Sequence, residues 1–253
     1  METIFLYIFT GLLGLVVGSF LNALIYRLKT KESILRGRSL CPNCRKPLAW
    51  HDLIPIFSFI MLGGRCRNCK KKISWQYPLV ELATGILFII ALRVNLSNDL
   101  GTLFLLRDWF IVSVLMVIFV YDLKWGYILD RVTLPAIIVI FGVNILLGEA
   151  WSNLFLAAAV GAGFFFLQYF LSRGKWVGGG DIRMGALMGF ALGWPGVLVS
   201  LVIAYLIGAI VSIYLLASKR KKIGSKIALG TFLAAGTLIA LFWQEQIIIW
   251  YLY

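Results

Sequence analysis

Two aspartates stand at the edges of long apolar runs, where a carboxylate is costly to keep without a partner or a task. Asp122 ends one apolar run, and Asp181 begins another directly after Gly178, Gly179 and Gly180. If the fold brings the two carboxylates together, they cannot both ionise easily and they share a proton. One could then deprotonate a water while the other protonates a scissile carbonyl, which is the chemistry of an aspartic protease.

The glycines before Asp181 suit this task, because they let a substrate backbone approach closely. They could equally form a flexible connection between two helices. Acids inside membrane segments also serve ion and proton pathways in transporters, so the spacing alone leaves that alternative open.

Four cysteines form a second constellation. They occur as Cys41-Pro-Asn-Cys44 and Cys66-Arg-Asn-Cys69, two C-x2-C pairs at the spacing of a zinc ribbon. Two such turns supply four thiolates for a closed, tetrahedral and therefore structural zinc site. A reducing cytosol argues against disulfides, and a redox pair is the remaining alternative. The metal would supply much of the folding energy of this small region.

The elements that must position these residues are membrane helices. The 253 residues are 61% hydrophobic and 14% charged, and apolar runs recur along the whole chain. The runs are continuous, which makes a β-barrel unlikely. We expect an all-α polytopic membrane protein with about eight transmembrane helices, the first one retained rather than cleaved as a signal peptide. The expected segments are 4–26, 78–92, 109–121, 132–147, 154–171, 182–192, 197–217 and 227–243.

In the first segment, Gly14 and Gly18 form a G-x-x-x-G pair that predicts a tight helix contact.

The net charge of +13 does not indicate nucleic-acid binding, because the basic residues follow a membrane topology. The loop 27–77 holds twelve basic residues and only two acids, which places it in the cytoplasm and the N-terminus outside. Alternating the segments then puts Asp122 and Asp181 at the cytoplasmic face, and leaves Arg93 and Arg107 outside. Asp108 is expected to be an ordinary solvated charge in an outer loop.

The basic run Lys219–Lys222 favours a positive-inside anchor, with anionic lipid or substrate contact as the alternative. The single histidine, His51, excludes a His-rich metal centre and a two-histidine zinc protease motif.

These motifs together resemble one family, the bacterial type IV prepilin peptidases (prepilin leader peptidase/N-methyltransferase). Gly178-Gly-Gly-Asp181 fits the G-x-G-D motif of polytopic aspartic proteases. The resemblance also rests on Gly18-Ser-Phe-Leu-Asn22, the two cysteine pairs, Asp52-Leu-Ile-Pro55, Tyr77-Pro-Leu-Val-Glu81, Tyr121-Asp122 with Asp130, and Asp181-Ile-Arg183-Met-Gly185. It covers most of the chain, with the motifs in the family's order.

The resemblance implies a bacterial inner-membrane enzyme that cleaves the basic leader of prepilins or pseudopilins after a glycine, at the cytoplasmic face. It implies Asp122 and Asp181 as the catalytic pair, and Cys41, Cys44, Cys66 and Cys69 as zinc ligands. It also implies methylation of the new N-terminal amine with S-adenosylmethionine. Asp130, Arg183 and Glu81 are supporting candidates.

The resemblance implies three regions: a first transmembrane helix (1–26), a cytoplasmic zinc-ribbon-like domain (27–77) and a transmembrane protease domain (78–253). The chain departs from the family pattern at Ile128-Leu129-Asp130, where the family has Ile-Pro-Asp or Ile-Pro-Asn, at Arg183 in place of lysine, and at Ile227–Ala234. These departures bear on substrate fit more than on chemistry. An ion- or proton-coupled carrier and a catalytically silent pilus-assembly scaffold remain alternatives, and the oligomeric state is open.

Overall fold

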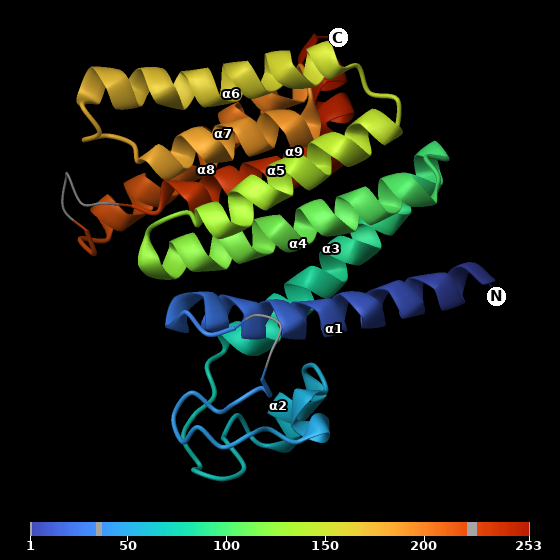
Figure 1. Cartoon of the computed structure of the whole chain (residues 1–253), viewed down its shortest axis with the longest axis vertical. Coiled ribbons are helices and arrows are strands. Elements are labelled where there is room, and N and C mark those ends of the chain that lie inside the picture. The colour runs from blue at the N-terminus through green and yellow to red at the C-terminus, as the bar shows by residue number, and fades with distance from the viewer. Residues whose placement is uncertain (1, 34–36, 222–226, 253) are drawn as a thin grey trace. The chain divides into compact units, whose positions relative to one another are not determined.

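The computed structural model describes residues 2–33, 37–221 and 227–252, and this part of the chain is built from helices (Figure 1). It divides into two compact units, Met1–Asp99 and Leu100–Tyr253. The all-α architecture predicted from the continuous apolar runs is therefore confirmed. The predicted division into regions 1–26, 27–77 and 78–253 is a functional one and stays a prediction.

The first unit is a pair of long helices with an irregular region between them. It contains α1 (Glu2–Thr30), the 3-10 helix η1 (Trp50–Leu53), α2 (Phe57–Met61) and α3 (Gln76–Asn98). The predicted G-x-x-x-G contact is confirmed: a Cβ added to Gly14 would lie 2.7 Å from the Gly85 Cα, and one added to Gly18 would lie 2.7 Å from the Glu81 Cα. Glycine thus lets the backbones of α1 and α3 touch.

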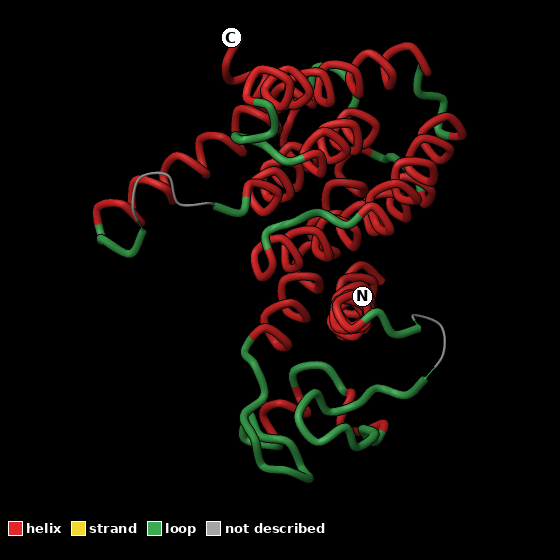
Figure 2. The backbone as a smooth tube through the Cα atoms, turned by 60° about the vertical axis from the view of Figure 1, so that its left-hand side comes forward, coloured by secondary structure: helices red, strands yellow, loops and turns green. Residues whose placement is uncertain are grey.

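The second unit is a bundle of six helices. Figure 2 traces their backbones in red. The six helices are α4 (Thr102–Trp125), α5 (Asp130–Leu146), α6 (Trp151–Ser172), α7 (Gly179–Leu192), α8 (Gly196–Ala217) and α9 (Leu229–Leu252). The helix α7 packs along α6 and also contacts α5, α8 and α9. Gly161 of α6 faces Gly185 of α7 so closely that neither position has room for a Cβ.

Each of the eight predicted segments coincides with a helix. Six of these helices are long and apolar enough to cross a membrane: α1, α3, α4, α6, α8 and α9. The other two, α5 with 17 residues and α7 with 14, are shorter than a full span of about 20 residues. The chain is thus a multi-pass membrane protein with six span candidates among its described residues.

The expectation that Asp108 is a solvated loop charge was wrong. Asp108 is only 3% exposed, inside α4, and it forms an ion pair with the neighbouring Arg107 at 2.9 Å. Arg107 also donates to Asn144 Oδ1 of α5 (3.1 Å), and the Asn144 amide donates to the Phe190 carbonyl of α7 (2.6 Å). Because the two charges satisfy each other, α4 can begin at Thr102, seven residues before the predicted segment.

Candidate active site

Asp122 lies in the last turn of α4 and is 3% exposed. Its Oδ2 accepts hydrogen bonds from the Thr231 amide (2.7 Å) and the Thr231 hydroxyl (3.2 Å). Thr231 is in the first turn of α9, where amides have no partner within the helix and the helix dipole is positive. The carboxylate of Asp122 is therefore held at the N-terminus of a helix that follows it by more than one hundred residues.

Asp181 lies in the first turn of α7, just before the predicted segment 182–192, and is half-buried. Its Oδ2 accepts a hydrogen bond from the amide of Gly178 (2.8 Å), the residue that precedes the helix. The side chain thus reaches back to cap its own helix, as in the acidic half of a capping box. Burial raises the pKa of Asp181 to about 6, the Gly178 amide opposes this, and the charge of Asp122 adds to it.

Ile128, in the connection between α4 and α5, lies between the segments that carry the two aspartates. A Cβ on Gly180 would lie 3.1 Å from the Ile128 Cβ, and one on Gly230 would lie 2.8 Å from the Ile128 Cδ1 and 3.0 Å from the Asp122 Oδ2. Gly180 and Gly230 are the residues before Asp181 and Thr231. The structure therefore brings Asp122 and Asp181 into one site, where their charges interact.

Arg183 connects the elements around this site. Its guanidinium forms an ion pair with Asp130, the first residue of α5, and donates to the Gly179 carbonyl at 3.2 Å. Asp130 and Arg183, the two supporting candidates in this unit, thus adjoin the first turn of α7, which carries Asp181, in partly exposed positions. The ion pair joins the start of α5 to the first turn of α7.

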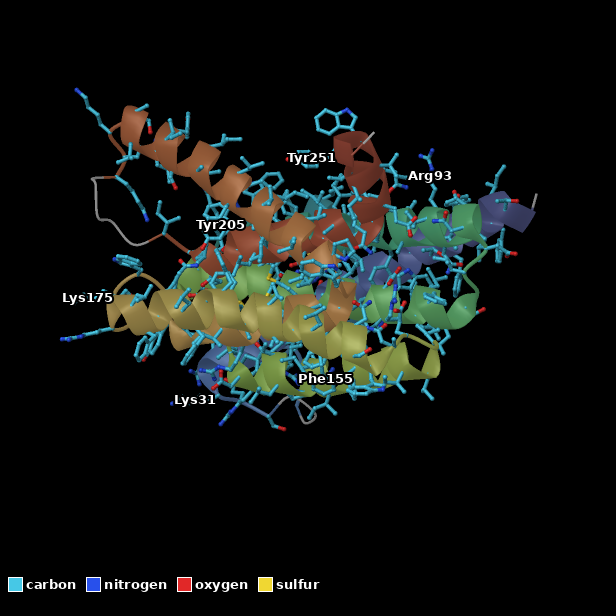
Figure 3. The ribbon with its side chains drawn as sticks, turned by 90° about the horizontal axis from the view of Figure 1, so that it is seen from above. Lys31, Arg93, Phe155, Lys175, Tyr205 and Tyr251 are labelled. Carbon is cyan, nitrogen blue, oxygen red and sulfur yellow. The ribbon has the colours of Figure 1, made fainter. Side chains whose placement is uncertain are left out.

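Three residues of the site were not singled out from the sequence as functional residues. Thr231 binds Asp122, Ile128 separates the two aspartates, and Tyr127 bonds its hydroxyl to that of Tyr121 at 2.9 Å. Thr231 and Ile128 fall in stretches noted for departing from the family pattern, and those departures were the available signal. Tyr205 of α8 is a further neighbour that interacts electrostatically with Asp181. Figure 3 labels it, together with Lys175, which projects where α6 passes into α7.

The four cysteines come together in the first unit. Their sulfur atoms all lie within 4.8 Å of one another, and those of Cys41 and Cys69 are 4.0 Å apart. A tetrahedral site with metal–sulfur bonds of about 2.3 Å places sulfurs about 3.8 Å apart, so the cluster could hold a metal ion.

Each cysteine pair sits in the same kind of turn. The Arg45 amide donates to the Cys41 carbonyl (2.9 Å), and the Lys70 amide donates to the Cys66 carbonyl (3.0 Å). Hydrogen bonds from backbone amides lower the pKa of Cys66 to about 7, despite burial that opposes them, which favours the thiolate. Burial raises the pKa of Cys41 to about 11.

Glu81 belongs to the first unit and is 7% exposed. Its carboxylate accepts the amide of Ile56 at 2.8 Å and a hydrogen bond from Ser19. Glu81 therefore attaches the cysteine-containing region to α3.

Matches to two protein families cover much of the chain. Residues 12–94 match the bacterial peptidase A24 N-terminal domain, and residues 109–213 match the type IV leader peptidase family. The first match contains the four cysteines and Glu81. The second contains Asp122 and Asp181.

Curated relatives agree with the family matches. A prepilin leader peptidase/N-methyltransferase of Myxococcus xanthus is 37% identical over 83% of this chain and 63% of the relative. Proteins of the same name from Aeromonas hydrophila (30% identical) and Bacillus subtilis (32%) align over 95% and 94% of this chain and 92% and 95% of their own lengths. The chain thus spans less than two thirds of the Myxococcus relative and nearly all of the other two.

No solved structure gives a significant match. The family matches and the six span candidates indicate a multi-pass protein of the bacterial inner membrane. On its motifs, its site and its relatives, the chain belongs to the type IV leader peptidase family.

Proposed function

We propose that this protein is a membrane aspartic endopeptidase that removes the leader of prepilins or pseudopilins after a glycine and then methylates the new N-terminus. The observation that carries the peptidase assignment is the meeting of Asp122 and Asp181 in one site of the second unit. The relatives' names support both activities. No contact among the described residues favours a carrier or a silent scaffold.

The surroundings of the two carboxylates suggest their roles. Asp122 faces the N-terminus of α9 and two donors of Thr231, which favour the ionised form. We assign it the task of deprotonating the water that attacks the scissile carbonyl. Burial raises the pKa of Asp181 to about 6, and we assign it the shared proton, which it gives to the carbonyl oxygen. The resulting tetrahedral intermediate collapses when a proton is returned to the leaving nitrogen.

Two of the three glycines before Asp181 have separate structural tasks. Gly178 is exposed and extended, and a Cβ there would have only loose contacts, so a substrate strand can lie along it. Gly180 packs against Ile128 and has no room for a side chain without displacing it. We therefore propose Gly178–Gly180 as the loop that receives the residues around the cleaved bond.

Zinc is the metal that we propose for the four-cysteine cluster. Cys41, Cys44, Cys66 and Cys69 would hold it with no position left for water, so it would stabilise the fold and take no part in cleavage. Replacing Cys66 with serine should abolish bound zinc in the purified protein, measured by elemental analysis. The Asp99→Asn protein should keep one zinc per chain, and zinc-free wild type would contradict the assignment.

The methyl donor implied by the relatives' name is S-adenosylmethionine, which would supply the methyl group for the new amine. The buried Glu81 carboxylate is already engaged by Ile56 and Ser19, so its contacts do not fit a donor site. We assign Glu81 an anchoring role and derive no step through the donor.

The orientation follows from the charges. We propose that the N-terminus lies outside and that the cysteine cluster and the aspartates lie at the cytoplasmic face, because the basic loop 27–77 should stay inside. Of the basic run Lys219–Lys222, the last residue lies outside the described residues. We propose that the rest of the run anchors α8 at the same face.

The test is to incubate the purified protein in detergent with a prepilin, with and without S-adenosylmethionine, and to identify the products by mass spectrometry. We expect leader release after the glycine in both reactions, and one added methyl group only with the donor. Cleavage without methylation would refute the proposed methyltransferase activity and leave the peptidase activity in place. No cleavage of several prepilins by zinc-loaded protein would overturn the proposal.

A further inference from the structure

The segment Trp50–Met61 exposes a run of large apolar side chains, here called the apolar stripe. The stripe consists of six large apolar side chains that are each at least 37% exposed: Trp50, Leu53, Ile54, Phe57, Ile60 and Met61. No charged residue occurs from Leu53 to Gly64. Six large apolar side chains exposed within twelve residues are unusual outside a membrane or an interface.

The stripe is held beside the membrane helices rather than beyond their ends. The Ile56 amide donates to Glu81, which lies five residues after the start of α3, or about 7–8 Å along a helix that rises 1.5 Å per residue. Glu81 in turn touches Gly18 of α1, twelve residues before the end of that helix. Both α1 and α3 are candidate spans, so the Ile56 amide lies beside residues that belong to them.

The inner face of the same segment is fixed, so the stripe cannot turn inward. Phe59 packs on Trp75 with ring centroids 5.0 Å apart, and its ring also lies against Gly64. Ile56 has a positive φ of 59°, which a β-branched residue adopts only where its surroundings impose it. Trp75, 69% exposed one residue before α3, is the kind of aromatic side chain that marks a membrane interface.

The rest of the loop carries the complementary charge. Exposed basic side chains surround the cysteine turns at Arg45, Lys46, Arg65, Lys70, Lys71 and Lys72. Asp52 is the one acid between Gly37 and Trp75, and Arg67 pairs with it at 2.9 Å. Such a surface attracts anionic lipid headgroups.

We propose that the stripe inserts into the boundary between headgroups and acyl chains, and that the basic residues of the loop bind anionic lipid. The occupant is lipid because two candidate spans flank the loop, and Glu81 holds Ile56 about 7–8 Å along one of them. An apolar face with a basic surround is the pattern of interfacial helices. The four-cysteine cluster would then be fixed on the membrane surface. This inference is independent of the peptidase activity.

The test places the photocrosslinking residue p-benzoylphenylalanine in the full chain, in nanodiscs of phosphatidylcholine and phosphatidylglycerol. The test positions are Phe57 and Ile60. Leu12, an exposed residue of α1, is the lipid-facing reference, and Lys46 is the control on the same loop. Zinc content, measured for each variant, reports whether the loop is folded.

We expect lipid adducts on acyl carbons at positions 57 and 60, as at position 12, and no acyl adducts at position 46, which the proposal places at the headgroups. Zinc-loaded variants that crosslink lipid at 12 but not at 57 and 60 would overturn the proposal. So would crosslinks from 57 and 60 to a second copy of the chain, or to an added prepilin, in place of lipid.

Discussion

At the scale of single residues, the catalytic proposal depends on how differently the two aspartates are held. Asp122 receives donors from another helix, whereas the donor to Asp181 among the described residues is the amide that precedes its own helix. Motifs in the sequence predicted both aspartates. They could not predict Thr231, because the contact joins residues 109 positions apart and depends on how α4 meets α9.

Replacing Thr231 with valine tests this contact. The variant keeps the backbone donor but loses the hydroxyl donor to Asp122, and a hydrogen bond to a charged group contributes about 1.5–3 kcal/mol. We expect leader release to slow by about ten- to a hundredfold. Thr231→Ser, which retains a hydroxyl, should stay near the wild-type rate. Equal rates for valine and serine would show that the hydroxyl has no role.

The pH dependence of cleavage tests the assignment of the proton to Asp181. A proton donor must be protonated, and the protonated fraction of Asp181 falls as the pH rises through about 6. We expect the single-turnover rate of leader release to decline above that pH, whereas an aspartate with an ordinary pKa of about 3.9 would lose its proton two units lower. A rate that stays constant between about pH 5 and about pH 9 would contradict the assignment.

At the scale of elements, close helix contacts set the position of Asp181. Gly189 of α7 packs against the backbone of Ala158 in α6, and backbone atoms cannot move aside as a flexible side chain can. The glycines before Asp181 predicted room for a substrate strand, but the sequence did not predict that Gly189 packs against α6.

Gly189→Ala should therefore destabilise the second unit by about 1–3 kcal/mol, the usual cost of overpacking. The measurement is thermal unfolding in detergent, followed together with leader release. Gly163→Ala is the matched control, since Gly163 lies in α6 with nothing within 4 Å of an added Cβ. Unfolding of both variants at the wild-type temperature would contradict the contact.

The ends of the helices were harder to predict than their existence. The apolar runs predicted all eight long helices, but the predicted start of α4 at residue 109 is wrong by seven residues. Charged residues lower the mean hydropathy of a segment, so Arg107 and Asp108 were left out of the predicted one. The pair Arg107–Asp108 and its contact with Asn144 become visible only when α4, α5 and α7 are assembled.

At the scale of the whole molecule, two compact units carry two kinds of chemistry. The first holds four cysteines that could bind a metal, and the second holds the aspartate pair. The cysteine spacing predicted the cluster well, because a C-x2-C turn is a local structure. The apolar stripe at Trp50–Met61 was not predicted, since its exposure depends on the anchoring of Ile56 by Glu81.

The measurement that tests the central claim most directly compares leader release by the wild type, Asp122→Asn and Asp181→Asn. The control is Asp99→Asn, the same chemical change at an exposed residue whose φ of 52° asparagine tolerates. We expect both site variants to lose cleavage while keeping the wild-type unfolding temperature and zinc content, and the control to remain active. Cleavage that survives either site substitution would contradict the two-aspartate mechanism.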